Sequence, residues 1–307
     1  MKKLIWIFQA ALFYLFTLAF ALIPERSVNF AGRLIGTVIP GILGKRKRIA
    51  IDNIQKALPF MKQNPSWSGQ FETAEEIAAE MFRHLGTSLV EVCRLYHGEG
   101  ERVLCRIEVR GREHFERART GTRGVLVSTG HCGNWELMAL GLNWIFNENG
   151  SAVARQQNNP YLNKMVEKMR GRYLNKVIYK QGALRGIIGA LKKNGVIGLL
   201  ADQAVFPEEG ALIDVMGRKA WASKAPVIIA RKTGAILLPT FIHREKDRHI
   251  ITIYPEHSLG DDASDEGIRR DTQELSRYLE NFICAHPTDW YWVHRRWKRA
   301  GEVSDAA

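Results

Sequence analysis

The sequence is poor in cysteine, and its cysteines form no recognisable pair. The four of them, in 307 residues, are scattered, and none stands at the Cys-x-x-Cys spacing of zinc knuckles and redox motifs: Cys93, Cys105, Cys132 and Cys284. This pattern favours a reducing compartment over a disulfide framework. The chain also lacks Gly-x-Ser-x-Gly and His-Glu-x-x-His, which argues against a serine hydrolase and a zinc hydrolase.

Acidic residues are too few to balance the basic ones. The chain has 44 lysines and arginines against 32 aspartates and glutamates, for a formal net charge of +12. An excess of this size predicts an anionic partner, namely nucleic acid, an anionic membrane surface or an acidic substrate. A solvated basic surface without a partner is the plain alternative.

Charge is absent from a long segment that follows Lys2 and Lys3. Leu4 to Ile23 has no charged residue over 20 positions, about the length that crosses a hydrocarbon core. A cleaved signal peptide is the competing interpretation, although this stretch is longer than a usual signal core. Val28 to Leu43 is also apolar and is expected in the membrane interface. We therefore expect an anchor over residues 1–44 and a catalytic domain over 45–307. Basic residues are more numerous after the first helix, which favours a cytoplasmic domain.

The remainder alternates short apolar strands with helices. This predicts an α/β fold with a mixed, mostly parallel sheet flanked by helices, behind an N-terminal membrane helix. A long helix is expected over 73–97, beginning with a capping box at Thr73 and Glu76, and a short one over 49–58. An antiparallel pair is expected near residues 236–253. Strands are expected over 107–110, 124–129, 151–154, 177–179, 196–201, 236–243 and 249–253.

The segment GVLVSTGHCGNWE contains the clearest chemical signal. A buried strand runs into a glycine turn with His131, and Glu136 lies just inside the next helix. Asn134 is a natural N-cap for that helix. An imidazole in such a turn can take a proton from an attacking hydroxyl, and a carboxylate can orient the ring. A histidine that only packs at the strand end is the plain alternative, and a Cys132 thiolate nucleophile is a rival.

Other polar residues are expected at the same edge of the sheet. Arg155 and Arg170 follow the catalytic helix and are suited to phosphate, although a solvated helix face would explain them too. Asp202 and Gln203 end the apolar strand VIGLLA, where ligands bind in open α/β sheets. They are candidates for substrate contact or for positioning His131, with a simple turn cap as the alternative.

The last part of the chain, DWYWVHRRWKR, interleaves aromatic and basic residues. Nucleic-acid binding would use such aromatics for stacking, and a membrane surface would place tryptophans beside basic groups at the headgroups. The apolar N-terminus favours the membrane, so we expect no nucleic-acid partner. Packing of these tryptophans on the sheet is an equally strong alternative.

Taken in order, these motifs resemble the late acyltransferases of lipid A biosynthesis, the lauroyl and myristoyl transferases of lipopolysaccharide assembly. The resemblance covers nearly the whole chain and includes the apolar N-terminus, HCGNWE, Arg155 with Asn159-Pro160, Asp202-Gln203 and HPTDWYWVHRRWK. It departs where Val215 and Met216 stand in place of the aromatic residues common before the glycine that Gly217 matches.

The resemblance implies a glycerolipid-acyltransferase-like fold and an O-acyltransferase at the bacterial inner membrane. His131 and Glu136 match the family's His-x-x-x-x-(Asp/Glu) pair, and substrate contacts are expected at Arg155, Asn159, Arg170, Asp202 and Gln203. The implied donor is acyl carrier protein, and the implied acceptor is a Kdo-bearing lipid A precursor. The resemblance also implies that no metal and no bound cofactor are needed. Another lipid acceptor remains open: a glycerophospholipid, a phosphatidylinositol mannoside or an aminolipid. A hydrolase that transfers to water and a non-catalytic membrane scaffold are the alternatives from other classes.

Overall fold

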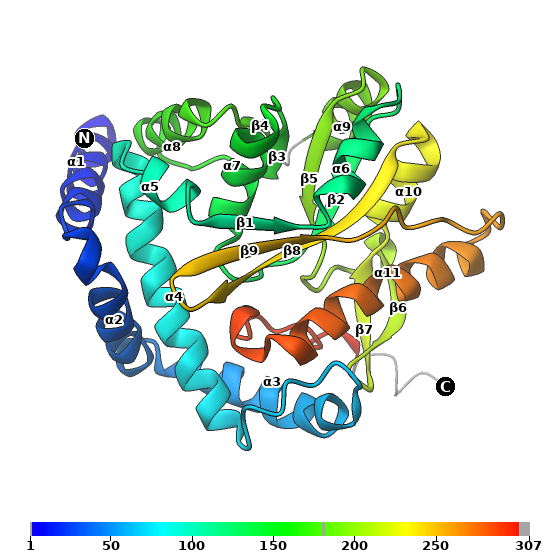
Figure 1. Cartoon of the computed structure of the whole chain (residues 1–307), viewed down its shortest axis with the longest axis horizontal. Coiled ribbons are helices and arrows are strands. Elements are labelled where there is room, and N and C mark those ends of the chain that lie inside the picture. Colours follow the sequence, from blue (N-terminus) through cyan, green and yellow to red (C-terminus); the bar gives the residue numbers. More distant parts are fainter. Residues whose placement is uncertain (1, 180–181, 301–307) are drawn as a thin grey trace.

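A seven-stranded sheet lies at the centre of the computed structural model, which describes residues 2–179 and 182–300 (Figure 1). The strand order is β1-β9-β8-β2-β5-β3-β4, and every pair is parallel except β8 with β9. This confirms the predicted fold class and the antiparallel pair, and each predicted strand is found within two residues of its expected bounds. The strands are β1 (Ile107–Arg110), β2 (Val125–Thr129), β3 (Ser151–Ala154), β4 (Lys176–Tyr179), β5 (Val196–Leu200), β8 (Ile236–Glu245) and β9 (Arg248–Ile253).

Helices cover both faces of the sheet, because its central strands are apolar on both sides. In β2, Val125 and Val127 pack beneath α6 (Arg112–Arg119) and α7 (Trp135–Phe146). Leu126 points the other way, toward α9 (Ala183–Lys192), α10 (Ala225–Thr233) and α11 (Asp265–Ala285). Successive strand residues face opposite sides of the sheet. A continuous apolar run is therefore buried under helices on both faces.

The long helix α4 (Ala74–His97) connects the sheet to the N-terminal helices (Figure 1). It begins with the predicted capping box, in which Thr73 and Glu76 satisfy each other's backbone N–H groups. The short helix predicted over 49–58 is in fact α3 (Gly44–Gln63), which passes through Pro59. The helix continues because its buried face, with Ile54 before the proline and Met61 after it, packs in the core. The cost of the missing hydrogen bond is offset by that burial.

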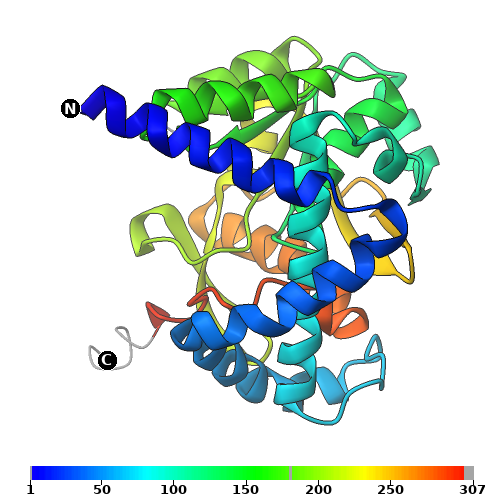
Figure 2. The same ribbon diagram turned by 90° about the vertical axis from the view of Figure 1, so that its left-hand side faces the viewer.

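The first helix, α1 (Lys2–Ala21), is long and apolar enough to cross a membrane, and most of it is exposed. It lies along one side of the molecule against α4 and α8 (Pro160–Arg172), as Figure 2 shows. The second, α2 (Val28–Ile42), continues the same side and leaves large apolar side chains uncovered. The exposed apolar residues of both helices include Leu4, Phe8, Leu12, Phe16, Phe30, Leu34, Val38 and Ile42. A surface of this kind is consistent with membrane association.

Glycines allow α2 to press closely on α4. A Cβ added at Gly32 would lie 2.4 Å from the Thr87 Cα, and one at Gly86 would lie 2.2 Å from the Gly32 carbonyl oxygen. The backbones therefore approach closely, in the small-residue packing common between membrane helices. Arg33 of α2 also forms an ion pair with Glu80 of α4, with 2.5 Å between nitrogen and oxygen.

One element was missing from the sequence prediction. The stretch between β5 and α10, predicted as a loop, contains the hairpin β6 (Gly210–Val215) and β7 (Arg218–Ser223). Its turn residues Met216 and Gly217 both have positive φ, the conformation that two-residue hairpins need. Met216 is buried in the core, so this non-glycine turn residue hid the hairpin from sequence patterns.

Candidate active site

The glycine turn of GVLVSTGHCGNWE lies at the carboxyl end of β2, in the middle of the sheet. The neighbouring strand β5 runs parallel, with Thr129 opposite Leu200, so His131 and Asp202 each lie two residues beyond a strand end. A Cβ at Gly130 would lie 3.1 Å from the Asp202 Cβ, so glycine is needed there for the two loops to approach this closely. The topology therefore brings together two residues that are 71 positions apart in the sequence.

Asp202 holds His131 by two hydrogen bonds. The His131 Nδ1 lies 2.7 Å from Asp202 Oδ1, and the His131 backbone N–H donates to Oδ2 at 2.9 Å. The Trp290 indole N–H also donates to Oδ2, at 2.9 Å. Burial raises the pKa of the Asp202 carboxyl, but these hydrogen bonds and the charge of His131 outweigh it and hold the pKa below its usual value. Asp202 is thus an ionised acceptor, which places the ring proton on Nδ1.

With its proton on Nδ1, the ring presents the lone pair of Nε2 to the open side. The His131 side chain is 22% exposed, whereas that of Asp202 is only 3% exposed. The amide nitrogen of Gln203 lies 3.3 Å from Nε2. Trp135 and Tyr291 lie next to the ring and to each other, with centroids 5.2 and 6.3 Å from it and 5.7 Å apart. The imidazole is a supported base at the mouth of an aromatic-walled cleft.

Glu136 does not orient His131, contrary to the sequence interpretation. Both of its carboxylate oxygens accept from Arg170 Nη2, at 2.8 and 3.0 Å. The pair joins the first turn of α7 to α8, and Arg170 is therefore next to the site, as expected. Asp202 takes the role that the sequence interpretation gave to Glu136, as the carboxylate that orients His131. Positioning His131 was one of the two roles considered for Asp202.

The first turn of α7 is also held by Asn134 and by the buried Glu91. Asn134 caps the helix as predicted, accepting from the Leu137 N–H at 3.1 Å. Its amide donates to Glu91 Oε2 at 3.0 Å, and Glu91 is buried. Arg244 and His249 also contact Glu91, at 2.7 and 3.0 Å. Burial raises the pKa of Glu91, but these two neighbours outweigh it and hold the pKa far below its usual value. A charged network therefore supports the catalytic turn.

Cys132 is not the nucleophile. Its side chain is fully buried, and its backbone forms an isolated bridge with Trp290. Burial raises the pKa of this thiol well above its usual value, so it stays protonated and unreactive.

The two remaining expected residues follow β3, whose carboxyl end lies at the same edge of the sheet as those of β2 and β5. Arg155 is exposed in the loop after β3. Asn159 is buried and caps α8, accepting from the Tyr161 N–H at 3.0 Å and donating to the Trp6 carbonyl at 2.9 Å. Asn159 therefore ties α8 to α1 in this structure, a contact that the sequence did not suggest.

The aromatic C-terminal segment packs inside the protein rather than on a membrane. Trp290, Trp292 and Trp297 are all buried, and the buried Arg296 donates to the Trp221 carbonyl at 2.6 Å. The membrane interpretation is therefore wrong for these tryptophans. Sequence reasoning missed Trp290 as part of the site, although its indole holds Asp202 and its neighbour Tyr291 donates from its backbone to the His131 carbonyl at 3.0 Å.

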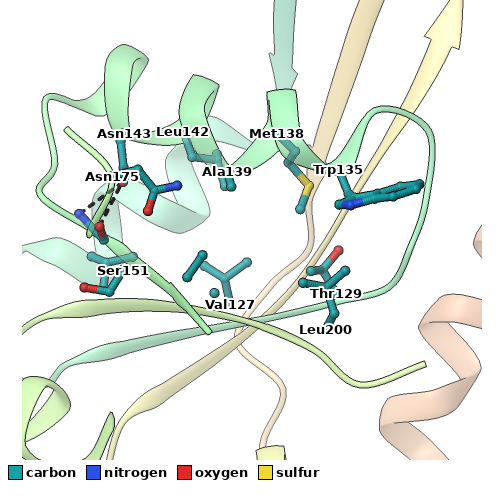
Figure 3. A pocket seen from close by; sticks show the side chains of 14 residues that line it. Val127, Thr129, Trp135, Met138, Ala139, Leu142, Asn143, Ser151, Asn175 and Leu200 are labelled. Carbon is teal, nitrogen blue, oxygen red and sulfur yellow. Dashed lines mark hydrogen bonds between the residues drawn. The ribbon is translucent and has the colours of Figure 1, made fainter. Parts of the chain in front are cut away.

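A narrow apolar cavity of about 50 Å³ lies between α7 and the sheet (Figure 3). Trp135 and Thr129 line the end near the catalytic turn, and Asn143, Ser151 and Asn175 line the far end. Met138, Ala139 and Leu142 form its α7 wall, and Val127, Val196, Gly198 and Leu200 form its sheet wall. Within residues 2–179 and 182–300, His, Cys, Asp and Glu side chains form no group of three or more that would hold a metal ion.

Comparison with known proteins gives a consistent result. A family model described as bacterial lipid A biosynthesis acyltransferase matches residues 2–299. The chain is 27% identical to the lipid A biosynthesis palmitoleoyltransferase of Escherichia coli K12, over 90% of this chain and 86% of that protein. It is 25% identical to the lipid A biosynthesis lauroyltransferase of the same organism, over 91% of this chain and 88% of that protein. It is also 25% identical to a phosphatidylinositol mannoside acyltransferase of Mycobacterium tuberculosis, over 61% of this chain and 58% of that protein.

Proposed function

Because the chain belongs to the bacterial lipid A biosynthesis acyltransferase family, we propose that it transfers a fatty acyl group from acyl carrier protein to a hydroxyl of a Kdo-bearing lipid A precursor. The observation that carries this proposal is the His131–Asp202 pair, which leaves the ring proton on Nδ1 and places Nε2, 3.3 Å from the Gln203 amide nitrogen, at an aromatic cleft beside an apolar cavity. A base next to an apolar tunnel suits the transfer of a long acyl chain to an alcohol.

The reaction begins when the His131 Nε2 takes the proton of the acceptor hydroxyl. Asp202 stabilises the resulting imidazolium through the 2.7 Å bond to Nδ1. The acceptor oxygen attacks the thioester carbonyl and forms a tetrahedral oxyanion. The Gln203 amide and the first backbone N–H groups of α7 are the donors placed to stabilise that charge. When the C–S bond breaks, His131 returns its proton to the leaving thiolate.

Glu136 and Arg170 act beside this pair rather than within it. Their ion pair holds the start of α7, and with it Trp135 and the helix amides, at a fixed distance from His131. Glu136 is thus a positioning residue, and Arg170 is neutralised by it. Arg155, exposed on the loop after β3, is proposed to meet a phosphate of the donor or acceptor.

The protein is proposed to work at the cytoplasmic face of the inner membrane, with α1 and α2 in contact with lipid. The apolar surface of these helices supports this placement, as does the larger number of basic residues after α1. The formal net charge of +12 suits an anionic membrane surface and an acidic carrier protein.

The cavity under α7 is proposed to hold the acyl chain. Its walls are apolar along their length, and its far end is closed by the buried amides of Asn143 and Asn175 (Figure 3). The cavity is too small for a fatty acyl chain unless side chains move, and Met138 on its α7 wall is flexible enough to do so. The closed end would then set the longest chain accepted.

Side chains introduced at Gly198 should shorten the preferred acyl chain. Gly198 faces α7 together with Val196 and Leu200, and a Cβ there meets only the Ser151 carbonyl oxygen, at 3.9 Å. Gly198→Val is expected to lower kcat/KM for the longest accepted donor by roughly tenfold or more, because filling a pocket excludes methylenes. Competition between acyl donors of different length measures this.

The matched control is Gly198→Ala, which adds one carbon and should have an intermediate effect. Equal losses for short and long donors in both variants would contradict the assignment, since they would indicate a disturbed sheet rather than a filled cavity.

The proposed function is tested by product analysis with the full chain in membranes. Acyl carrier protein thioesters and acyl-CoA are offered as donors, with a tetraacylated Kdo-lipid A precursor, a phosphatidylinositol mannoside and a glycerophospholipid as acceptors. His131→Asn serves as the blank. We expect acylation of the lipid A precursor from the carrier protein, lost in the blank.

Acylation of the mannoside instead would favour the second candidate, which the mycobacterial relative supports. Release of free fatty acid without any acylated lipid would contradict the proposal of acyl transfer and would indicate a hydrolase.

A further inference from the structure

A wide groove lies outside the cleft at His131. It has a volume of about 820 Å³ and runs between α1 and α8, with the end of α4 behind it. Figure 2 shows the two helices side by side along this face of the molecule. None of its lining residues also lines the cleft at His131 or the cavity under α7. The groove is therefore not part of the site where the reacting groups meet.

A row of cations forms one side of the groove. Lys164, Lys168 and Arg172 follow one another at four-residue intervals, so they lie on one face of α8 over about 12 Å. No aspartate or glutamate lines the groove, and none forms an ion pair with these three residues in the described chain. Glu167, the acid between them in sequence, contacts the Tyr179 hydroxyl instead. Arg172 also donates to the Tyr96 carbonyl at 3.3 Å, but among residues 2–179 and 182–300 no carboxylate neutralises the row.

The opposite side of the groove is apolar. Ile7, Ala11 and Leu15 of α1 face the row, and Met165 and Met169 of α8 form the floor between them. The small Ala10 and Ala11 leave the space that the groove occupies. This wall is continuous with the exposed apolar surface of α1 and α2, which is suited to lipid chains. A ligand that fits must therefore have both a negative head and a hydrocarbon tail.

We propose that this groove binds one anionic glycerophospholipid of the bilayer. Its phosphate lies on Lys164, Lys168 and Arg172, and one acyl chain lies between α1 and the methionines of α8. The lipid bridges two helices that otherwise contact each other mainly near Asn159, so it holds α8 against the membrane helix. Arg170, on the other side of α8, reaches Glu136 at the catalytic site. Lipid binding is thus linked through α8 to the start of α7.

The test counts lipids bound to the full-length protein by native mass spectrometry. The protein is released from zwitterionic detergent and titrated with phosphatidylglycerol or phosphatidylcholine. We expect one phosphatidylglycerol to bind, and its Kd to rise at least tenfold in Lys164→Gln/Lys168→Gln/Arg172→Gln, since each basic residue contributes on the order of 1 kcal/mol near an anionic lipid. Ala11→Trp, which fills the apolar half, should weaken binding without any change of charge.

The matched control removes three positive charges from α9 and the residue that follows it. Arg185→Gln/Lys192→Gln/Lys193→Gln should leave the Kd within about twofold, because α9 packs on β4, β5 and α10 rather than on α1. If both triple variants bound phosphatidylglycerol equally weakly, the proposal would be overturned. The lipid would then be attracted by the overall positive charge of the protein rather than by this groove. Equal affinity for phosphatidylcholine, or for glycerol phosphate without chains, would overturn it too.

Discussion

Asp202→Asn is expected to lower kcat by about three to four orders of magnitude. In the wild type, the carboxylate accepts the Nδ1 proton of His131 at 2.7 Å and leaves Nε2 free as the base. The asparagine amide can donate to Nδ1 instead, which moves the ring proton to Nε2, where no proton can be accepted. It also removes the negative charge that stabilises the imidazolium. Single-turnover acyl transfer with saturating donor measures this loss directly.

Glu136→Gln is the matched comparison. Like Asp202→Asn, it replaces one carboxylate oxygen with an amide nitrogen. It leaves the His131–Asp202 pair intact and retains an amide oxygen for Arg170, so the loss should be at most about a hundredfold. If Glu136→Gln were as damaging as Asp202→Asn, or if Asp202→Asn kept near-normal activity, the assignment of Asp202 as the partner of the base would fail.

Glu91→Leu is expected to destabilise the protein by about 3–5 kcal/mol. Glu91 is buried, and it is the shared acceptor for Arg244, His249 and the Asn134 amide. Its removal leaves the Arg244 guanidinium, whose side chain is 9% exposed, without a counter-charge. Thermal unfolding of the detergent-purified protein should show a fall in Tm of several degrees or more.

Two further variants separate a lost charge partner from a simple loss of volume. Glu91→Leu/Arg244→Leu removes both charges and should be less destabilised than Glu91→Leu alone. Asp52→Ala breaks the exposed pair with Lys56 and should change the stability by less than about 1 kcal/mol. A double variant that is additively worse would show that Arg244 does not depend on Glu91.

The fold was largely predictable because its signals are local. The strand over 125–129 begins with three apolar residues, Val-Leu-Val, and is buried at every position. Thr73 with Glu76 marks the start of α4 within one helical turn. Predictions failed where tertiary packing outweighed a local preference. Pro59 lies inside α3 because both sides of it are buried, and Met216 takes a positive φ because the core accepts its side chain.

The sequence proposed His131, Asp202 and Gln203, which the structure places together, but it did not give the pairing of His131 with Asp202, and it missed Trp290. Sequence spacing suggested Glu136, five residues from His131, as the partner of the base. The sheet instead places β2 beside β5, and both His131 and Asp202 lie two residues after a strand end. Had this strand order been known, the shared offset would have identified the pair, but the order of parallel strands is set by packing of the whole chain.

The contact of Trp290 with Asp202 has a consequence for how the enzyme is made. His131 and Asp202 leave the ribosome well before Trp290, whose indole holds the carboxylate and whose backbone bridges Cys132. A nascent or truncated chain thus contains His131 and Asp202 but lacks the segment around Trp290 that holds them in place. Because α1 precedes both loops and Trp290 in the chain, its apolar surface is made before the segment that completes the candidate site.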